Sequence, residues 1–340
     1  MLNVQNLTKT FSDTTVVNSV GFTVGQEEIF ALLGPSGCGK TTTLRLIAGF
    51  ERADHGEIEL MGQLVGGRGT HVPPEKRGIG FVFQNYALFP HLSVIQNVAF
   101  GLKSLPKAKR MKRAEELLEM VQLQDLRYRR PQAMSGGEQQ RVALARSMGP
   151  NPKLILLDEP FSSLDPELRE STRLEVHKLL KSVNMSAILV THDIEEALSF
   201  ADRMAVMRQG QIEQVGTPEE NYHKPETAFV ANFLGQSNII QGIADGCWVQ
   251  TQLGQLQIGS PTFGQVLISI RPEHLVMQTP NGGCVGTVRK RDFKGSNLTY
   301  EIDFNDHRCL VQASYDCSVQ VGQSVELKAI EDAIVVQEQT

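Results

Sequence analysis

A glycine-rich turn between an apolar run and a lysine constrains this chain more than any other stretch. The run IFALL at 29–33 leads into GPSGCGKT at 34–41, which matches the spacing G-x-x-x-x-G-K-[ST]. Glycines allow backbone angles that turn successive N–H groups inward, and the N-terminus of a following helix adds partial positive charge. The pattern therefore predicts a loop that holds the phosphates of a nucleoside triphosphate. Lys40 would neutralise the β- and γ-phosphates, and the Thr41 hydroxyl would ligate Mg²⁺.

Short apolar runs indicate the fold class around this loop. They lie at 29–33, 79–83, 154–157, 187–190 and 204–207. Continuous runs are typical of strands buried on both faces of a parallel sheet, so we expect an α/β domain with helices outside the sheet. HGEIELMGQLV at 55–65 alternates instead, and with residues 2–24 it predicts a smaller antiparallel sheet at one edge.

The strand signal is absent between 84 and 150, where helical spacing takes its place. Ala114, Leu117, Leu118 and Val121 lie on one face of a helix within KRAEELLEMVQL. We expect a helical insertion in the α/β core over about 84–150. Further along, Asp165 followed by a proline predicts the N-cap and first turn of another helix.

The sequence pattern changes again near residue 235. From there short strands such as QVLISI and LTYEIDF alternate with glycine-containing turns, as in a small barrel or sandwich. A chain of 340 residues usually holds more than one domain. We therefore expect an α/β nucleotide-binding domain over 1–235 and an all-β, OB-like domain over 236–340.

Charge and cysteine content argue against several function classes. The net charge of −5 gives no reason to expect nucleic acid as a general partner. The five cysteines form no C-x-x-C pair, which argues against a disulfide framework or a zinc site. The N-terminus does not resemble a secretion signal, and no apolar run approaches the ~20 residues needed to cross a bilayer. If the protein acts at a membrane, other chains must supply the crossing.

Two carboxylates follow the apolar run LILL directly. Because ligands of α/β sheets bind at the carboxyl ends of strands, Asp158 is expected to reach Mg²⁺ and Glu159 to polarise the water that attacks the γ-phosphate. The alternative is a carboxylate pair that caps the next turn. A small switch GTPase has no need of the second acid, and the sequence has no N-K-x-D segment for reading guanine.

A second glycine pair precedes a helix far along the chain from the first loop. In MSGGEQQRVALARS at 134–147, Ser135, Gly136 and Gly137 would present free N–H groups, which makes a second anion site. Two anion sites in one chain suggest a γ-phosphate held between two copies of the protein. An ordinary capped helix is the favoured explanation when the segment is considered alone.

Taken in order, these motifs closely resemble the ATP-binding subunits of ABC transporters, over residues 1 to about 235. Gln84 in FVFQNYALFPHLSV resembles the Q-loop, and SGGEQ at 135–139 resembles the signature. After the Asp158-Glu159 pair, SSLD at 162–165 resembles the D-loop, and VTHD brings His192 to the position of the switch histidine.

The resemblance implies a role for each matching residue. Gln84 would contact the metal, Glu159 would act as general base, and His192 would steady the γ-phosphate and the attacking water. Asp165 would line a dimer seam. ATP would lie between the phosphate loop of one protomer and the signature of the other, in contact with Ser36, Gly37, Cys38, Gly39, Lys40, Thr41, Thr42, Ser135, Gly136, Gly137 and Glu138.

Two positions depart from the family pattern. Glu138 stands where the simplest signature has glutamine, a form found in many import ATPases. Phe11 in LTKTFSD stands where the adenine-stacking aromatic is often tyrosine, and a phenyl ring still stacks through its face. Packing of Phe11 in the core is the alternative.

Family resemblance also implies partners and a location. One ATPase unit without a membrane span implies a homodimer that pairs with two transmembrane permease subunits and a separate solute-binding protein. The chain would then be peripheral, at the cytoplasmic face of the inner membrane. NYALFPHLSVIQNVAFGLK at 85–103 would be the socket for a permease helix, with Tyr86 and Phe89 exposed, and plain helical packing is the alternative.

The C-terminal stretch points to import rather than export. ISIRPEHL at 268–275 resembles the regulatory TOBE extension of importers for maltose, sulfate, polyamines, thiamine and ferric iron. Three stretches most resemble ferric-iron import ATPases, with polyamine and sulfate importers next. They are THVPPEKRGIGFVFQNYALFPHLSVIQNVAFGL, FLGQSNII and TQLGQL. Outside alternatives are a non-transport ABC ATPase, which usually carries two ATPase units or a coiled-coil insert, and a P-loop kinase or switch, which has no use for SGGEQQ.

Overall fold

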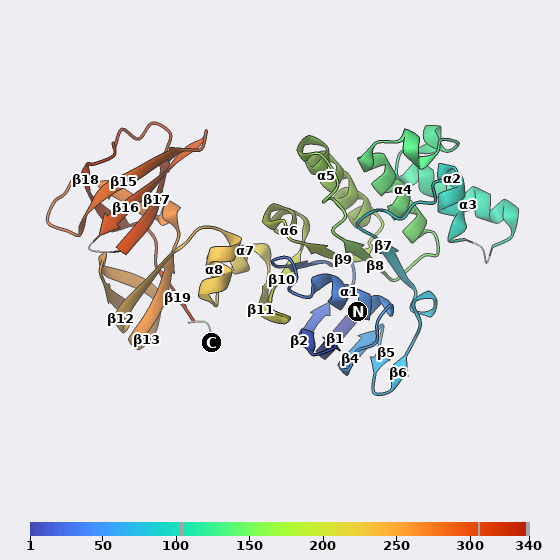
Figure 1. Cartoon of the computed structure of the whole chain (residues 1–340), viewed down its shortest axis with the longest axis horizontal. Helices are drawn as coiled ribbons and strands as arrows, with labels where there is room; N and C mark the ends of the chain where they lie inside the picture. Colours follow the sequence, from blue (N-terminus) through green and yellow to red (C-terminus); the bar gives the residue numbers. More distant parts are fainter. Residues whose placement is uncertain (103–104, 305–306, 338–340) are drawn as a thin grey trace. The chain divides into compact units, whose positions relative to one another are not determined.

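The chain folds as two units, Met1–Pro218 and Glu219–Thr340 (Figure 1). The structure is a computed structural model that describes residues 1–102, 105–304 and 307–337. Within these ranges no helix is both long enough and apolar enough to span a membrane.

A six-stranded sheet forms the centre of the first unit. Its strand order is β11-β10-β3-β9-β8-β7, and every neighbouring pair is parallel except β10 with β11. The five continuous apolar runs of the sequence form the five parallel strands, which confirms the expected α/β class. The bounds are β3 Ile29–Leu33, β7 Ile79–Val82, β8 Leu154–Asp158, β9 Ser186–Thr191, β10 Arg203–Arg208 and β11 Gln211–Gly216.

The predicted antiparallel sheet is also present. Its order is β2-β1-β4-β5-β6, and all its pairs are antiparallel. The bounds are β1 Leu2–Phe11, β2 Thr14–Val24, β4 His55–Leu60, β5 Gln63–Gly67 and β6 Thr70–His71.

Helices supply the rest of the first unit. Between β7 and β8 the described residues contain helices and no strand, as expected for a helical insertion, while Lys103, the last residue of the predicted permease socket, lies outside the described residues. The core helices are α1 Lys40–Ala48, α5 Pro166–Ser182 and α6 Ile194–Phe200; the insertion holds α2 Val94–Phe100, α3 Lys107–Met120 and α4 Gly136–Met148. Short 3₁₀ turns occur at Pro74–Lys76, Gln124–Leu126 and Pro131–Ala133.

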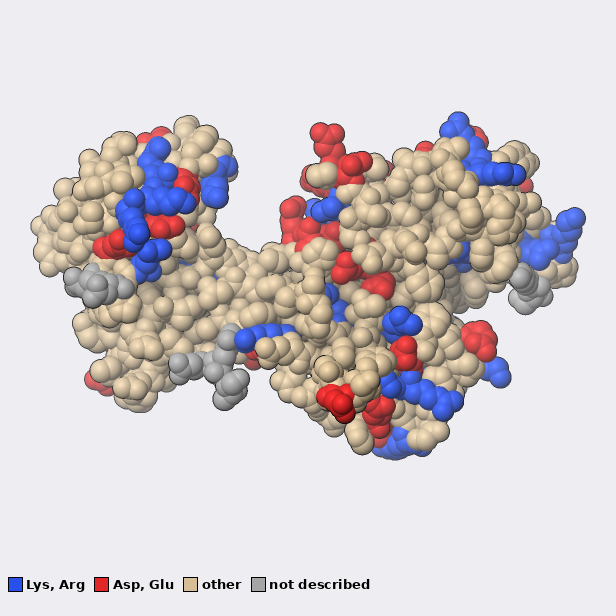
Figure 2. Space-filling view, viewed as in Figure 1, with Lys and Arg blue, Asp and Glu red and all other residues tan. Residues whose placement is uncertain are grey.

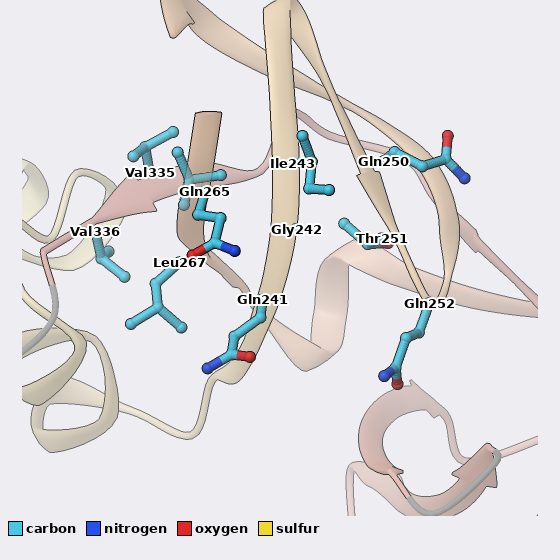
Figure 3. Close-up of a pocket in the computed structure, with 11 residues that line it drawn as sticks. Gln241, Gly242, Ile243, Gln250, Thr251, Gln252, Gln265, Leu267, Val335 and Val336 are labelled. Atoms are coloured by element: carbon cyan, nitrogen blue, oxygen red, sulfur yellow. The ribbon is translucent and has the colours of Figure 1, made fainter. Parts of the chain in front are cut away.

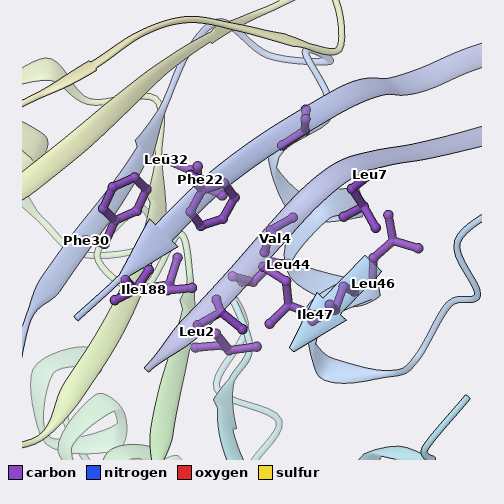
Figure 4. Close-up of a cluster of buried hydrophobic side chains, with 14 of the residues drawn as sticks. Leu2, Val4, Leu7, Phe22, Phe30, Leu32, Leu44, Leu46, Ile47 and Ile188 are labelled. Atoms are coloured by element: carbon purple, nitrogen blue, oxygen red, sulfur yellow. The ribbon is translucent and has the colours of Figure 1, made fainter. Parts of the chain in front are cut away.

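The core of the first unit lies where α1 meets both sheets (Figure 4). The stacked rings of Phe22 and Phe30, with centroids 5.0 Å apart, join the antiparallel sheet to the parallel one. Leu44 and Leu46 of α1 are fully buried in the same cluster. Burying each such leucine contributes about 1.5–3 kcal/mol, so the helix that begins at Lys40 is firmly held.

The second unit is built from two antiparallel sheets, as the turn-rich sequence predicts. The orders are β12-β13-β19 and β14-β18-β15-β16-β17. Over β15–β17, Lys and Arg lie beside Asp and Glu, for example Arg289 with Asp303, so this face is mixed in sign (Figure 2). The bounds are β12 Asn238–Thr251, β13 Gly254–Ile270, β14 Leu275–Gln278, β15 Val285–Phe293, β16 Asn297–Phe304, β17 His307–Ser314, β18 Ser324–Ala329 and β19 Ile334–Val336, with a 3₁₀ turn at Pro272–His274.

Two short helices, α7 Pro218–His223 and α8 Ala228–Leu234, precede these sheets. The contacts divide the chain after Pro218, whereas the sequence change suggests a boundary near 236. Arg271 contributes contacts to this segment: it is 4 % exposed and donates to the carbonyls of Tyr222 at 2.9 Å, Ala231 at 2.6 Å and Gly235 at 2.9 Å. This buried guanidinium ties the α7–α8 segment to the β-rich unit.

Candidate nucleotide-binding and catalytic site

Four neighbouring parallel strands bring one part of the predicted site to one edge of the sheet, whereas Phe11 ends β1, Ser135 precedes α4 and Asp165 precedes α5. In the order β3-β9-β8-β7, their carboxyl ends lead to the phosphate loop, to His192, to the Asp158-Glu159 pair and to Gln84. Ligands of open α/β sheets bind outside these ends. Segments more than a hundred residues apart in the sequence are thus brought together at this edge.

The phosphate loop needs glycine at the positions where its backbone is most confined. Gly37 and Gly39 have positive φ values of 82° and 101°. A Cβ on Gly39 would lie 2.5 Å from Val16 O, and one on Gly34 would lie 2.3 Å from Met207 O. No larger residue fits at Gly34 or Gly39, so the loop is held close against β2 and β10.

Lys40 begins α1 and folds back over the loop. It is only 5 % exposed, and its Nζ donates to the carbonyls of Gly34 at 2.7 Å and Pro35 at 3.0 Å. Cys38 Sγ lies 3.8 Å from the same nitrogen. Burial raises the pKa of the Cys38 thiol even though the charge of Lys40 acts in the opposite direction. The ammonium is therefore fixed where phosphates would enter, beside a protonated thiol.

Thr41 and Asp158 form the part of the site suited to a cation. The Thr41 hydroxyl donates to Asp158 Oδ1 at 2.9 Å. Burial raises the pKa of Asp158 above its usual value, and the neighbouring Glu159 adds to this, while the Thr41 hydrogen bond acts against it. Hydroxyl and carboxylate oxygens are the donors that Mg²⁺ takes in proteins, so this pair fits the predicted metal.

Glu159 is the centre of a three-residue group. Its Oε2 accepts from Gln84 Nε2 at 3.2 Å, and its Oε1 lies 3.3 Å from His192 Nδ1. Glu159 has a φ of 44°, an uncommon angle for a residue with a side chain, and its N–H donates to Val190 O at 2.9 Å. Backbone strain of this kind persists where the surroundings enforce it, and it gathers at functional sites.

The segment after His192 is anchored by polar contacts. Thr191 Oγ1 accepts from the N–H of Asp193 at 2.9 Å and donates to Glu196 Oε2 at 2.6 Å. Burial raises the pKa of Glu196. Arg169 of α5 lies 3.6 Å from Asp193 Oδ2. The half-exposed imidazole of His192 is therefore carried on a fixed turn.

Ser135 and Glu138 cap α4 reciprocally. Ser135 N–H donates to Glu138 Oε2 at 2.7 Å, and Glu138 N–H donates to Ser135 Oγ at 3.3 Å, which is a capping box. The departure from glutamine at 138 is thus compatible with the helix start. A Cβ on Gly136 would lie 2.7 Å from Leu164 Cδ2, and one on Gly137 would lie 2.7 Å from Thr172 Oγ1. Both glycines allow α4 to approach the segment that follows β8.

Asp165 and Phe11 are both exposed. Asp165 occupies the N-cap position of α5, as predicted, but its side chain makes no capping bond to the helix. Phe11 ends β1 with 43 % of its surface exposed, and Lys9 Nζ lies 5.2 Å from its ring centroid. The alternative that Phe11 packs in the core is therefore wrong.

One expected feature of the permease socket is also wrong. Tyr86 is expected to be exposed, but it is buried, with 5 % of its surface exposed. Its ring turns inward, and its hydroxyl lies 2.8 Å from Ser163 Oγ. Phe89 is half-buried, with its ring centroid 4.3 Å from that of Phe100. Arg146, which sequence reasoning did not single out, donates to Tyr86 O at 2.8 Å. Nothing in the sequence marks Ser163 or Arg146 as partners of this turn.

Comparison with known proteins places this geometry in a family. A family model described as ABC transporter matches residues 17–162, and one described as TOBE domain matches residues 268–336. A protein of Pectobacterium atrosepticum named Fe(3+) ions import ATP-binding protein is 44 % identical over 338 residues, covering 96 % of this chain and 97 % of that protein. This chain belongs to the ATP-binding subunits of ABC transporters. It is an ABC ATPase, in which ATP hydrolysis is coupled to transport, and it energises an importer.

Other relatives carry different names. A spermidine/putrescine import ATP-binding protein of Marinobacter nauticus is 43 % identical over 321 residues, covering 90 % of this chain and 85 % of that protein. A sulfate/thiosulfate import ATP-binding protein of Methylococcus capsulatus is 41 % identical over 325 residues, covering 92 % of this chain and 91 % of that protein. Relatives with three different names thus match this chain at 41 %, 43 % and 44 % identity.

Solved structures show a related fold over 64 % of this chain. The ATP-binding cassette MJ0796, described as a dimeric structure of a post-hydrolysis state bound to ADP and Pi, is 31 % identical with a TM-score of 0.57, covering 64 % of this chain and 99 % of that one. The cbiO1 protein of Clostridium perfringens, described as part of the ABC transporter complex cbiONQ, is 28 % identical with a TM-score of 0.60, covering 64 % of this chain and 89 % of that one.

Proposed function

We propose that this chain powers a ferric-iron importer and that Glu159 is the general base of its ATP hydrolysis. The observation that carries the catalytic part is the Glu159 carboxylate, 3.2 Å from Gln84 Nε2 and 3.3 Å from His192 Nδ1, at the sheet edge that bears the phosphate loop. A carboxylate in this place can take the proton of a water molecule that the amide and the imidazole orient. His192 would also donate to the γ-phosphate.

The phosphates would be held by the loop and the start of α1. Ser36, Gly37, Gly39 and Thr42 would offer N–H and hydroxyl donors, and Lys40 would exchange its loop carbonyls for phosphate oxygens. Thr41 and Asp158, together with Gln84, would hold Mg²⁺, which neutralises phosphate charge when bound. Phe11 would stack on the adenine through its exposed face.

A homodimer would complete each ATP site. Ser135, Gly137 and Glu138 would approach the γ-phosphate of the opposite protomer, and the exposed Asp165 would lie at the seam between the two copies. Two observations support this arrangement. The Asp165 side chain makes no capping bond to α5, and the related cassette MJ0796 has been solved as a dimer. The capping box at Ser135 would have to open or rotate when the signature meets a nucleotide.

The permease subunits would dock beside the Q-loop. Phe83, directly before Gln84, forms an aromatic group with Phe81 and with Phe50, which follows α1; the ring centroids lie 4.4–5.9 Å apart. Phe50 and Phe83 are 42 % and 37 % exposed. Exposed aromatic groups of this kind favour a helix of a partner protein. The chain would then sit at the cytoplasmic face of the inner membrane, next to two permeases and a separate solute-binding protein.

Ferric iron is proposed as the cargo, and polyamine, sulfate, thiamine and sugar remain the alternatives for the same motor. The described residues contain no group of three or more His, Cys, Asp or Glu side chains placed to hold a metal ion. Cargo would therefore be chosen by the partner subunits, and the support for iron is the set of stretches that resemble ferric-iron import ATPases. Uptake of labelled ferric iron, spermidine and sulfate in cells lacking this chain tests the choice. Normal iron uptake with loss of another solute would contradict it.

Glu159→Gln tests the catalytic proposal. The amide keeps the size of the side chain but cannot accept the proton, so we expect kcat to fall by about 10²–10⁴-fold while ATP still binds. ATP should then hold the variant as a dimer in size-exclusion chromatography. Glu115→Gln, on the exposed face of α3, is the matched control and should keep the parent rate. Hydrolysis by Glu159→Gln at the parent rate would refute the assignment of the base.

The second unit is proposed to be regulatory, as its TOBE resemblance implies. A cavity of about 630 Å³ lies among β12, β13 and β19, and its lining includes Gln241, Gln250, Gln252 and Gln265 (Figure 3). All the lining side chains are uncharged. The cavity therefore offers hydrogen-bonding amides but neither carboxylates for ferric ion nor cations for sulfate.

A further inference from the structure

The turn that follows Gln84 is held in an unusual backbone conformation. Tyr86 and Ala87 have positive φ values of 60° and 46°, and two such residues in succession need support from their surroundings. Tyr86 is 5 % exposed, so its ring supplies part of that support by packing inside the unit.

Arg146, near the C-terminus of α4, fixes this turn from one side. Its Nη2 donates to Tyr86 O at 2.8 Å and its Nη1 to Ala87 O at 2.7 Å. The guanidinium carbon lies 5.6 Å from the ring centroid of Phe89. Burial lowers the pKa of Arg146, which nevertheless remains a cation at neutral pH. The backbone of the turn is therefore anchored to α4.

The Tyr86 hydroxyl fixes the turn from the other side. It lies 2.8 Å from the hydroxyl of Ser163, which belongs to the SSLD segment between Glu159 and Asp165. The neighbouring Ser162 accepts from Gln84 Nε2 at 3.3 Å and donates to Glu159 O at 2.9 Å. Two adjacent serines thus join the segment of Gln84 to the segment of Glu159.

We propose that Tyr86 is a positioning residue for ATP hydrolysis. Its hydroxyl bond to Ser163 sets the spacing of two loops, and that spacing holds the Gln84 amide 3.2 Å from the Glu159 carboxylate. Tyr86 itself touches no reacting atom and acts through Gln84. The proposal rests on the roles proposed above for Gln84 and Glu159.

Tyr86→Phe is the direct test, because it keeps the buried ring and removes only the hydroxyl. Loss of one net hydrogen bond that acts in the transition state corresponds to about a three- to tenfold fall in kcat, with the KM for ATP unchanged. Ser163→Ala removes the same bond from an exposed partner, so it should show the same fall, and the double variant should be no slower than either single one. Tyr128→Phe, at a tyrosine that is 75 % exposed, is the matched control.

A second background separates positioning from packing. In Gln84→Ala the amide is absent, so adding Tyr86→Phe should no longer change kcat. If Tyr86→Phe slows both backgrounds by the same factor, the tyrosine does not act through Gln84 and the proposal is overturned. The proposal alone also fails if Gln84→Ala is slow while Tyr86→Phe and Ser163→Ala keep the parent rate. If Gln84→Ala itself keeps the parent rate, the role proposed for Gln84 fails first.

Discussion

Arg77 is a buried cation whose removal should loosen the helix that holds the phosphates. It is 5 % exposed, and its guanidinium donates to Val72 O at 2.7 Å, Leu46 O at 2.8 Å and Ile47 O at 2.7 Å. The last two carbonyls belong to the final turn of α1, which begins at Lys40. Burial lowers the pKa of Arg77 to about 10, so the group is charged at neutral pH and complements the negative end of the helix dipole.

The size of the effect follows from which carbonyls lose their donors in Arg77→Met. Leu46 O also accepts from Gly49 N at 3.2 Å and keeps that bond, whereas Ile47 O and Val72 O lose the donor supplied by Arg77. The buried Ile47 O left without a donor costs about 1–3 kcal/mol, the part-buried Val72 O costs less, and the relieved desolvation of the guanidinium offsets part of the sum. We expect the free energy of unfolding of the first unit to fall by about 2 kcal/mol, or about 30-fold in the equilibrium constant.

Urea unfolding followed by circular dichroism measures this change. The single tryptophan, Trp248, lies in the second unit, so its fluorescence reports a region that the substitution does not touch. Arg52→Met, at an exposed arginine of the first unit, is the matched control. Since α1 carries Lys40 and Thr41, the KM for ATP should also rise. If Arg77→Met unfolds at the same urea concentration as Arg52→Met, the argument from buried acceptors is refuted.

Further changes test packing and thiol chemistry. Gly137→Ala should lower the free energy of unfolding by about 1–3 kcal/mol, because the added Cβ would lie 2.7 Å from Thr172 Oγ1. Thermal unfolding measures this change. An unchanged melting temperature would mean that α4 moves aside, which contradicts the prediction. Because burial raises the pKa of Cys38, alkylation at Cys38 should require a higher pH than an ordinary thiol and lag behind the exposed Cys247, as read by mass spectrometry. Equal rates would contradict this order. Asn238→Ala removes three hydrogen bonds to backbone groups and should destabilise the second unit by about 2–4 kcal/mol, which tryptophan fluorescence would follow.

The α/β class, the parallel strands and the helical insertion could be predicted because continuous apolar runs and helical spacing are local signals. The motif positions could be predicted for a related reason, since a phosphate loop and a carboxylate pair after an apolar run are short patterns tied to strand ends. Burial of Tyr86 could not be predicted. An aromatic side chain in an irregular segment has no periodicity to assign it a face, and its orientation depends on Ser163, far along the chain.

Two buried arginines mark a second limit of sequence reasoning. Arg77 and Arg271 are expected at the surface by composition alone, because charged side chains are seldom buried without partners. Both are buried because backbone carbonyls from distant segments converge on them. Arg271 bonds the α7–α8 segment to the β-rich unit, consistent with the observed division after Pro218 rather than near 236.

Strand order explains why one edge of the sheet can serve a coupled reaction. β9 lies between β3 and β8, so His192 is placed between the phosphate loop and Glu159, and β7 lies beyond β8, so Gln84 meets Glu159 from the opposite side. A carboxylate flanked in this way changes its surroundings whenever either neighbouring loop moves. The loop on the β7 side carries the segment proposed to meet the permease. A displacement there would alter the contact between Gln84 and Glu159 directly, because that contact joins the loop after β7 to the loop after β8.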